Sequence, residues 1–322
     1  MGKVTVVGSY IVALVIDTDR IPLEGETVVG RNYHSTHGGK GSNMAVAAAR
    51  LGAQSTFIGK IGRDSFGKDF VSLLRREGVN ADGVLYSDQL PTAVGIIICS
   101  KRGTNAIVID MAANSAFLPK DVAAQQEVIA TSDVIVSPLE IPLETALAAA
   151  QLARKGGKKA ILNPAPAVDL RSLDLSSIYA LTPNEIEGRT CVGLDATDRI
   201  DDAELAVRLL DLGAKNVILT LGAKGVIWAC RESVRKIPAL KVDAVDTVGA
   251  GDAFNAGLAT GLSEHRPLLE AIALGVTAAS LSTRRRETID SYPCRPEVDE
   301  AVHELLYRSS MTGCSSPERG FS

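Results

Sequence analysis

Short apolar stretches alternate with longer amphipathic stretches along most of the chain. The apolar stretches 4–7 and 55–58 have the length of strands, whereas 42–51 and 64–76 have the apolar spacing of helices. Further strands are expected at 134–136, 160–162 and 217–220, and further helices at 143–155 and 203–212. Strands separated by such helices need crossover connections. The pattern therefore predicts an α/β fold, with a mostly parallel sheet and helices on both of its faces.

Two stretches, residues 11–36 and 92–110, interrupt this alternation. Both are rich in β-branched residues and glycines and lack a helical period. In the second, 92–100 and 105–110 flank a short turn and predict a hairpin. We expect the two insertions to pair into a small sheet. Such a sheet either caps an edge of the main sheet or forms a lid over a pocket, and we prefer the lid.

The chain length suits one large domain, and no repeat or clear linker divides it. We expect a single domain over residues 1–307. The tail at 308–322 contains Ser, Gly and Pro without a period, and we expect it to be disordered.

Composition narrows the function classes. The 322 residues are 46% hydrophobic and 4% aromatic, with a net charge of −4 and no basic stripe, which argues against a nucleic-acid partner. The five cysteines form no C-x-x-C pair, so disulfides and zinc are not expected. The first residues enter a strand pattern directly, and no stretch has the roughly 20 apolar residues of a membrane span. We expect a cytoplasmic protein without a membrane partner.

The strongest motif is the small-residue turn that precedes a helical pattern near residue 250. The backbone amides of Gly249, Ala250 and Gly251 are unobstructed, and at a helix N-terminus they predict an anion site. Such a site would stabilise a transferring phosphoryl group. Asp252 follows, where its carboxylate can accept the proton of an attacking hydroxyl. On spacing alone, a helix-capping role for Asp252 is equally supported.

A second glycine-rich turn opens the helix at 42–51. Gly39 and its neighbouring glycines permit a close approach to backbone, and Lys40 and Asn43 supply donors for sugar hydroxyls. The spacing is not that of a Walker A loop. Taken alone, the motif is also compatible with a simple strand-to-helix turn.

Two further polar motifs follow predicted strands. Asn184 and Glu187 lie three residues apart, and their oxygens suit Mg²⁺ with intervening waters. The alternative for Glu187 is a carboxylate favoured by a helix dipole. Thr220 and Gly222 follow the strand at 217–220, where they can contact nucleotide phosphates. Because parallel strands end at one edge of a sheet, these motifs are expected to share a ligand site.

In this order and spacing, the motifs resemble the ribokinase branch of the PfkB family of sugar kinases. The resemblance covers residues 4–293 and rests on GGKGSN at 38–43 and DTVGAGDAFNAG at 246–257, with NPAPA and TPNEIE between them. It implies a ribokinase-like fold, a β-sheet lid that often serves as a dimer interface, and transfer of the γ-phosphoryl group of ATP to a sugar hydroxyl. Mg²⁺ and K⁺ are the cofactors it implies.

The resemblance also implies residue roles. Asp252 becomes the base, with the amides of Gly249, Ala250 and Gly251 as the anion hole. The implied contacts are Gly39, Lys40, Asn43 and Glu140 with the sugar, Asn184, Thr220, Gly222 and Gly225 with the nucleotide, Glu187 with Mg²⁺ indirectly, and Asp246 and Val248 with a monovalent cation.

The chain departs from the family pattern in two places. Ribose-phosphorylating members usually carry Asn and Asp where this chain has Ile11 and Ala13, whose side chains cannot hydrogen-bond a hydroxyl. We infer a substrate that lacks a hydroxyl there, or one with an apolar or aromatic group near Tyr10. The stretch is similar to that of deoxyribokinases, except for the missing Asp. The second departure is Glu287, in place of a glycine beside the cation loop. The three arginines before it, 284–286, could contact a phosphate-bearing ligand, but they are more typical of a solvated helix end.

These observations bear on three possible functions. The leading one is an ATP-dependent kinase of a sugar or nucleoside. The alternative is a non-catalytic regulator that binds a sugar or nucleotide on the same scaffold. A nucleotide-dependent oxidoreductase is excluded because the chain has no G-x-G-x-x-G fingerprint.

Overall fold

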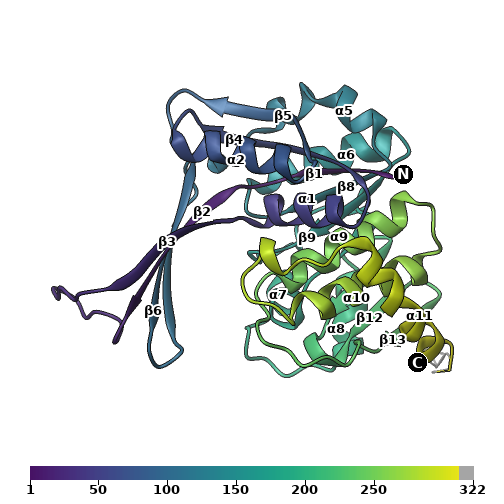
Figure 1. Cartoon of the computed structure of the whole chain (residues 1–322). Coiled ribbons are helices and arrows are strands. Elements are labelled where there is room, and N and C mark those ends of the chain that lie inside the picture. Colours follow the sequence, from purple (N-terminus) through teal and green to yellow (C-terminus); the bar gives the residue numbers. More distant parts are fainter. Residues whose placement is uncertain (312–322) are drawn as a thin grey trace.

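The computed structural model describes residues 1–311, in which a large sheet is covered by helices and a small sheet projects from one side (Figure 1). The nine strands of the large sheet are, in spatial order, β13 (Ser233–Ile237), β12 (Val226–Cys230), β11 (Asn216–Thr220), β10 (Ala180–Leu181), β9 (Lys159–Asn163), β8 (Val134–Pro138), β1 (Lys3–Val7), β4 (Gln54–Gly62) and β5 (Asn80–Ser87). All neighbouring pairs are parallel except β11–β12 and β12–β13 at one edge, so that β12 runs against the other strands. The predicted α/β fold with a mostly parallel sheet is confirmed.

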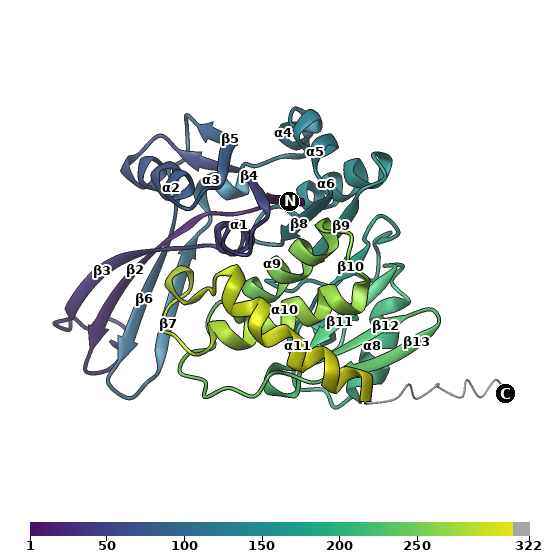
Figure 2. The same ribbon diagram turned by 45° about the vertical axis from the view of Figure 1, so that its right-hand side comes forward.

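Each face of the large sheet has its own hydrophobic core. Along β8, Val134 and Val136 enter one core and Ile135 enters the other. Strands buried on both faces read as continuous apolar runs, which is why they stand out in the sequence. The first core is lined by α1 (Lys40–Arg50), α2 (Ser65–Arg76), α9 (Ala250–Ser263), α10 (Leu268–Ser282) and α11 (Arg295–Met311). The second is lined by α4 (Pro119–Ala123), α5 (Gln126–Thr131), α6 (Leu143–Lys155), α7 (Glu185–Cys191) and α8 (Asp202–Leu210) (Figure 2).

The small sheet is built from the two insertions. Its strands are, in order, β3 (Arg31–Gly38), β2 (Ile11–Thr18), β6 (Ala93–Ser100) and β7 (Asn105–Asp110). The inner pair, β2 and β6, is parallel, and both outer pairs are antiparallel. The hairpin of β6 and β7 and the small separate sheet are as predicted. The short helix α3 (Ala112–Ser115) follows the hairpin.

Close packing of α9 against α10 fixes the helix that carries Asp252. A Cβ atom on Gly257 would come within 2.7 Å of the Gly275 Cα atom, and one on Gly275 within 2.7 Å of the Phe254 carbonyl oxygen. The two helices therefore meet through their backbones. Because every residue from Asp252 to Ser263 is buried, α9 has little freedom to shift.

The C-terminal helix is longer than expected. It continues to Met311, so residues 308–311 are helical, whereas the sequence predicts disorder from 308 onward. The rest of that predicted tail, 312–322, lies outside the described residues. Within residues 1–311, no helix combines the length and the apolar character needed to cross a membrane.

Candidate active site

The glycine turn before α9 presents backbone amides at a helix N-terminus. Gly249 caps the helix with φ 78°, in the left-handed region that favours glycine. In the part of the chain that the structure describes, the amides of Gly249 and Gly251 have no acceptor, and the amide of Ala250 makes only a 3.3 Å contact with the Thr247 carbonyl. With the positive end of the helix dipole behind them, these amides can bind negatively charged oxygens.

Asp252 lies in the first turn of α9 and is only 4% exposed. Its Oδ2 atom accepts a 2.8 Å hydrogen bond from the side-chain amide of Asn43, and the Lys40 ammonium lies 4.0 Å from its Oδ1 atom. Burial raises the pKa of Asp252 above its ordinary value, and Lys40 and Asn43 oppose that rise in part. A buried carboxylate with increased proton affinity, beside a fixed cation, is suited to accept a proton.

The first turn of α1 brings Lys40 and Asn43 to this carboxylate. Gly39 precedes the helix with φ 91°, and a Cβ atom there would come within 2.7 Å of the Ile11 amide nitrogen. Only glycine allows β2 to pass this close to the helix start. Ile11 of the small sheet is therefore adjacent to the residues around Asp252.

Glu140 ties this turn to the ends of two central strands. Its Oε2 atom accepts hydrogen bonds from the Ser9 hydroxyl at 2.5 Å and from the Lys40 amide at 2.7 Å. Burial raises the pKa of Glu140, and these donors and the Lys40 charge oppose the rise. Its Oε1 atom makes no hydrogen bond to any residue of 1–311 and remains for a ligand. Sequence reasoning did not single out Ser9, because its partner is 131 residues away.

Asn184 and Glu187 form a capping box at the start of α7. The Glu187 carboxylate accepts from the Asn184 amide, and the Asn184 side chain accepts from the Glu187 amide, each at 2.8 Å. Burial raises the pKa of Glu187, whose charge interacts with Lys40 and Asp252. The helix-start alternative is thus realised, and Glu187 still lies within the electrostatic field of the site.

The two glycines after β11 differ in their surroundings. Asn184 and Thr220 form an isolated β-bridge at this point. Gly222, φ 55°, begins the 3-10 turn η1 (Gly222–Lys224), and a Cβ atom there would meet nothing within 4 Å. A Cβ atom on Gly225 would come within 2.1 Å of the Ile237 carbonyl oxygen. Gly222 therefore faces open space, whereas close backbone packing and φ 95° both account for a glycine at 225.

The loop before the glycine turn closes around Asp246. Its two carboxylate oxygens accept hydrogen bonds from the amides of Val248 and Glu287, both at 3.1 Å. Glu287 adopts φ 68°, in the left-handed region that favours glycine. Its side chain accepts a 3.3 Å hydrogen bond from Thr36 of β3, so this loop also contacts the small sheet.

A polar chain that the motifs did not predict connects the sheet edge to α9. The Asn163 side chain donates to the Thr182 carbonyl at 2.8 Å, and the Thr182 hydroxyl donates to the Asn255 side chain at 2.7 Å. Asn255 in turn donates to the Gly251 carbonyl at 2.8 Å. The carboxyl ends of β9 and β10 therefore hold the turn that carries the free amides. The prolines after both strands were the only sequence signal for this edge.

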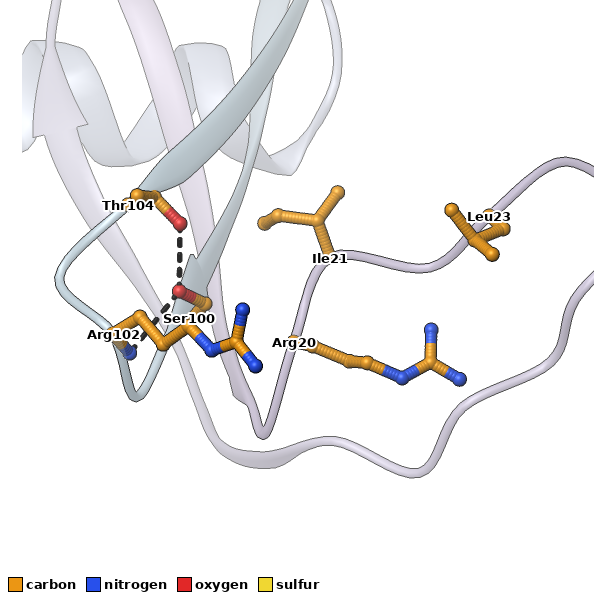
Figure 3. A pocket seen from close by; sticks show the side chains of 6 residues that line it. All are labelled: Arg20, Ile21, Leu23, Ser100, Arg102 and Thr104. Carbon is orange, nitrogen blue, oxygen red and sulfur yellow. Dashed lines mark hydrogen bonds between the residues drawn. The ribbon is translucent and has the colours of Figure 1, made fainter.

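A hollow of about 340 Å³ lies at the far tip of the small sheet (Figure 3). Strand pairing places Ser100 at the opposite end of the sheet from Ile11, so the hollow is separate from Asp252. The Ser100 and Thr104 hydroxyls share a 2.8 Å hydrogen bond, and Arg20 is paired with Glu26. The first contact closes the turn between β6 and β7, and the second lies in the connection between β2 and β3. We assign neither a catalytic role.

Residues 1–295 match the pfkB family carbohydrate kinases. The chain is 40% identical to ribokinase from Haemophilus influenzae, over 92% of this chain and 97% of that protein. It is 35% identical to deoxyribokinase from Salmonella typhi, with the same coverage of 92% and 97%. Its fold matches a structure of Arabidopsis thaliana ribokinase complexed with ribose and ATP, with a TM-score of 0.85, 28% identity and coverage of 94% and 98%. The similarity thus spans nearly the whole chain.

Proposed function

The chain belongs to the pfkB family of carbohydrate kinases, and we propose that its Asp252 is the general base that activates the sugar hydroxyl for attack on ATP. The observation that carries the proposal is the convergence on one buried carboxylate of Asn43, Lys40 and a helix turn with free amides. Nothing in the comparisons favours a non-catalytic regulator, and the buried Asp252 carboxylate and the free amides support catalysis.

The reaction is an in-line displacement. The hydroxyl oxygen forms a bond to the γ-phosphorus, the bond from that phosphorus to the bridging oxygen of ADP breaks, and the hydroxyl proton passes to Asp252. Lys40 and the amides of Gly249 and Gly251 lie where they can stabilise the negative charge on the transferring group. Gly39, Asn43 and the free Oε1 atom of Glu140 are the proposed sugar contacts.

The nucleotide is proposed to lie along the edge formed by Asn184, Thr220 and Gly222. Mg²⁺ would accompany its phosphates. The described residues contain no cluster of three or more His, Cys, Asp and Glu side chains that could hold a metal ion. Mg²⁺ commonly keeps several waters and uses few carboxylates in phosphate sites, so Glu187 fits as a partner that contacts it through water.

A monovalent cation such as K⁺ is proposed at the loop of Asp246 and Val248. Both carboxylate oxygens of Asp246 accept a backbone amide, but each keeps a second lone pair. These lone pairs and the loop carbonyls are suitable ligands. The cation would neutralise charge beside the anion-binding turn.

The experiment that tests the function is a coupled ADP-release assay with MgATP, with and without K⁺ and with a chelator. The panel contains ribose, 2-deoxyribose, ketohexoses, nucleosides and 2-keto-3-deoxygluconate. Turnover of one sugar that stops on chelation supports the proposal. ATP binding without ADP release for every compound would contradict it.

We propose that one apolar face of the small sheet lines the sugar site, since the Ile11 backbone lies against Gly39. Pairing in register puts Ile11 beside Ala93, and Ala13 beside Gly95, on the same face of β2 and β6. None of these side chains can hydrogen-bond a hydroxyl. We therefore propose a substrate whose edge toward β2 lacks a hydroxyl, such as a deoxy sugar.

Adding hydrogen-bonding groups at these positions is expected to alter substrate choice. The double variant Ile11→Asn/Ala13→Asp should raise kcat/KM for ribose relative to 2-deoxyribose by about tenfold or more, as expected for a gained hydrogen bond to a charged group. Competitive assays with both sugars measure the ratio. Val15→Asn, on the same face but farther from Gly39, is the control and should leave it unchanged. An unaltered ratio in the double variant would place the sugar elsewhere.

A homodimer through the small sheet is also proposed. Ile96 and Val108 pair across β6 and β7 on the face opposite to Ala13, and both are about half exposed or more; Ile107 and Ile109, also about half exposed, extend from the other face of β7. A strip of this kind is typical of an association surface, and the family often dimerises there. Val108→Asp is expected to convert dimers to monomers in sedimentation velocity, whereas Val207→Asp on α8, also exposed, should not. A monomeric wild-type protein at micromolar concentration would refute the dimer.

We also propose that the protein works in the cytoplasm, where ATP is available. The described cysteines, Cys99, Cys191, Cys230 and Cys294, are all free thiols, which is compatible with a reducing compartment.

A further inference from the structure

Tyr292 has a buried hydroxyl without a hydrogen-bond partner. The residue is 1% exposed, and its hydroxyl oxygen contacts no donor or acceptor within residues 1–311. Buried polar groups are nearly always paired because leaving them unpaired is costly. Such an exception therefore points to a role that the protein contacts alone do not explain.

This hydroxyl lies against the anion-binding turn. A Cβ atom on Gly249 would come within 2.7 Å of it. The segment that carries it follows the 3-10 turn η2 (Ile289–Ser291) and is held by Arg50, which donates to the carbonyls of Ile289 at 2.6 Å and Tyr292 at 3.3 Å. The position of the hydroxyl beneath Gly249 is therefore fixed from α1.

A second unpaired atom belongs to Asn43, whose side chain contacts the Asp252 carboxylate. Asn43 donates to Asp252 through its amide nitrogen, but its buried Oδ1 atom has no donor in the described part of the chain. Burial and the charge of Asp252 raise the pKa of Tyr292 well above its ordinary value, so the phenol keeps its proton. Tyr292 can donate, and Asn43 can accept.

We propose that Tyr292 is a positioning residue for phosphoryl transfer: its hydroxyl supports the glycine turn at Gly249 and donates, through one buried water, toward the Asp252 carboxylate. The inference rests on the proposed function, in which Asp252 is the base. The same water can donate to the Oδ1 atom of Asn43, which would satisfy both unpaired atoms. No motif found in the sequence includes this tyrosine.

The Asp252 carboxylate and the Tyr292 phenol act on each other, and several other charged groups act on one or both of them. Lys40 and Asn43 of α1 favour the ionised form of Asp252. Glu140 after β8 and Glu187 of α7 each experience the negative charge of Asp252, and Arg50 lies near Tyr292. All of these are unchanged when only the phenol oxygen is removed, so Tyr292→Phe isolates its contribution.

The sign of the effect follows from the donor role. A hydrogen bond donated to a carboxylate favours its ionised form and lowers its pKa. Removing the donor should raise the pKa of Asp252. Since the base is active only when ionised, the acid limb of kcat/KM should move to higher pH, by roughly 0.5–1 unit on the usual scale of such shifts.

The experiment compares pH profiles of kcat/KM for the wild-type protein, Tyr292→Phe, the control Tyr179→Phe and Asp252→Asn, together with their melting temperatures. Tyr179 is half-buried and precedes β10, at the end of the sheet opposite to the site. Between the two Phe variants, we expect the limb to move only in Tyr292→Phe, with a melting temperature close to that of the wild type. A limb that stays in place, or one that moves equally in Tyr179→Phe, overturns the role of Tyr292. Near-normal turnover of Asp252→Asn overturns the proposed function as well, and so separates the two failures.

Discussion

Asp252→Asn is expected to lower kcat by roughly 10²–10⁴-fold, the usual contribution of a general base. The amide keeps nearly the shape of the carboxylate, and its oxygen can still accept from Asn43, but it cannot take the proton of the attacking hydroxyl. Sugar and ATP binding should persist, because the amides and Lys40 remain. Single-turnover ADP release, with calorimetry of ATP binding, measures both quantities.

The pH profile gives this prediction a second readout. Burial raises the pKa of Asp252, so the wild-type activity should fall, as pH is lowered, at a pH above the ordinary aspartate value of about 4. The Asn variant should lose this acid limb. Asp211→Asn, at the exposed C-terminal end of α8, is the matched control and should retain both rate and limb. Turnover of Asp252→Asn within a factor of a few of the wild type would eliminate Asp252 as the base.

The sequence was sufficient to predict that the polar motifs lie at one edge of the sheet. Residues that follow parallel strands lie at the same edge, and Asn184 and Thr220 do form a bridge there. The strands could be found because burial on both faces makes them continuously apolar. The same rule could not predict the contact between Ser9 and Glu140, which depends on how the turn after β1 meets the end of β8.

Glycines show where sequence reasoning reaches its limit. Gly222 and Gly225 occupy the same motif, yet one faces open space and the other would clash with the Ile237 carbonyl. A glycine that leaves room for a ligand and a glycine that leaves room for the backbone look identical in sequence. Only the surrounding atoms separate the two reasons: Gly222 has open space beside it, whereas the space beside Gly225 is filled by backbone.

Tyr292 illustrates a different limit. Its ring is part of the first core, although its neighbours in the sequence are Ser291 and Pro293. What the sequence does not contain is the position of its hydroxyl beneath a turn more than 40 residues earlier in the chain. The contact between this hydroxyl and the turn depends on how the segment after α10 returns to the start of α9.

Gly249→Ala is expected to reduce both stability and catalysis. The residue has φ 78°, which costs an alanine roughly 1–2 kcal/mol, and the new Cβ atom would approach the Tyr292 hydroxyl to 2.7 Å. We expect the free energy of unfolding to fall by about 1–3 kcal/mol in chemical denaturation. Displacing an anion-binding amide should also lower kcat by roughly 10–10³-fold, because such donors act only when well positioned.

The neighbouring glycine supplies the control for stability. Gly251 is not in the left-handed region, and a Cβ atom there would meet nothing within 4 Å. The free energy of unfolding of Gly251→Ala should therefore equal or slightly exceed that of the wild type. Adding Tyr292→Phe to Gly249→Ala should restore part of the lost stability, because it removes the hydroxyl oxygen that the new methyl group meets first. Coupling between the two substitutions in a double-mutant cycle measures that contact directly. Equal stability of the two alanine variants would show that Gly249 is not strained, and additivity in the cycle would show that the hydroxyl does not support the turn.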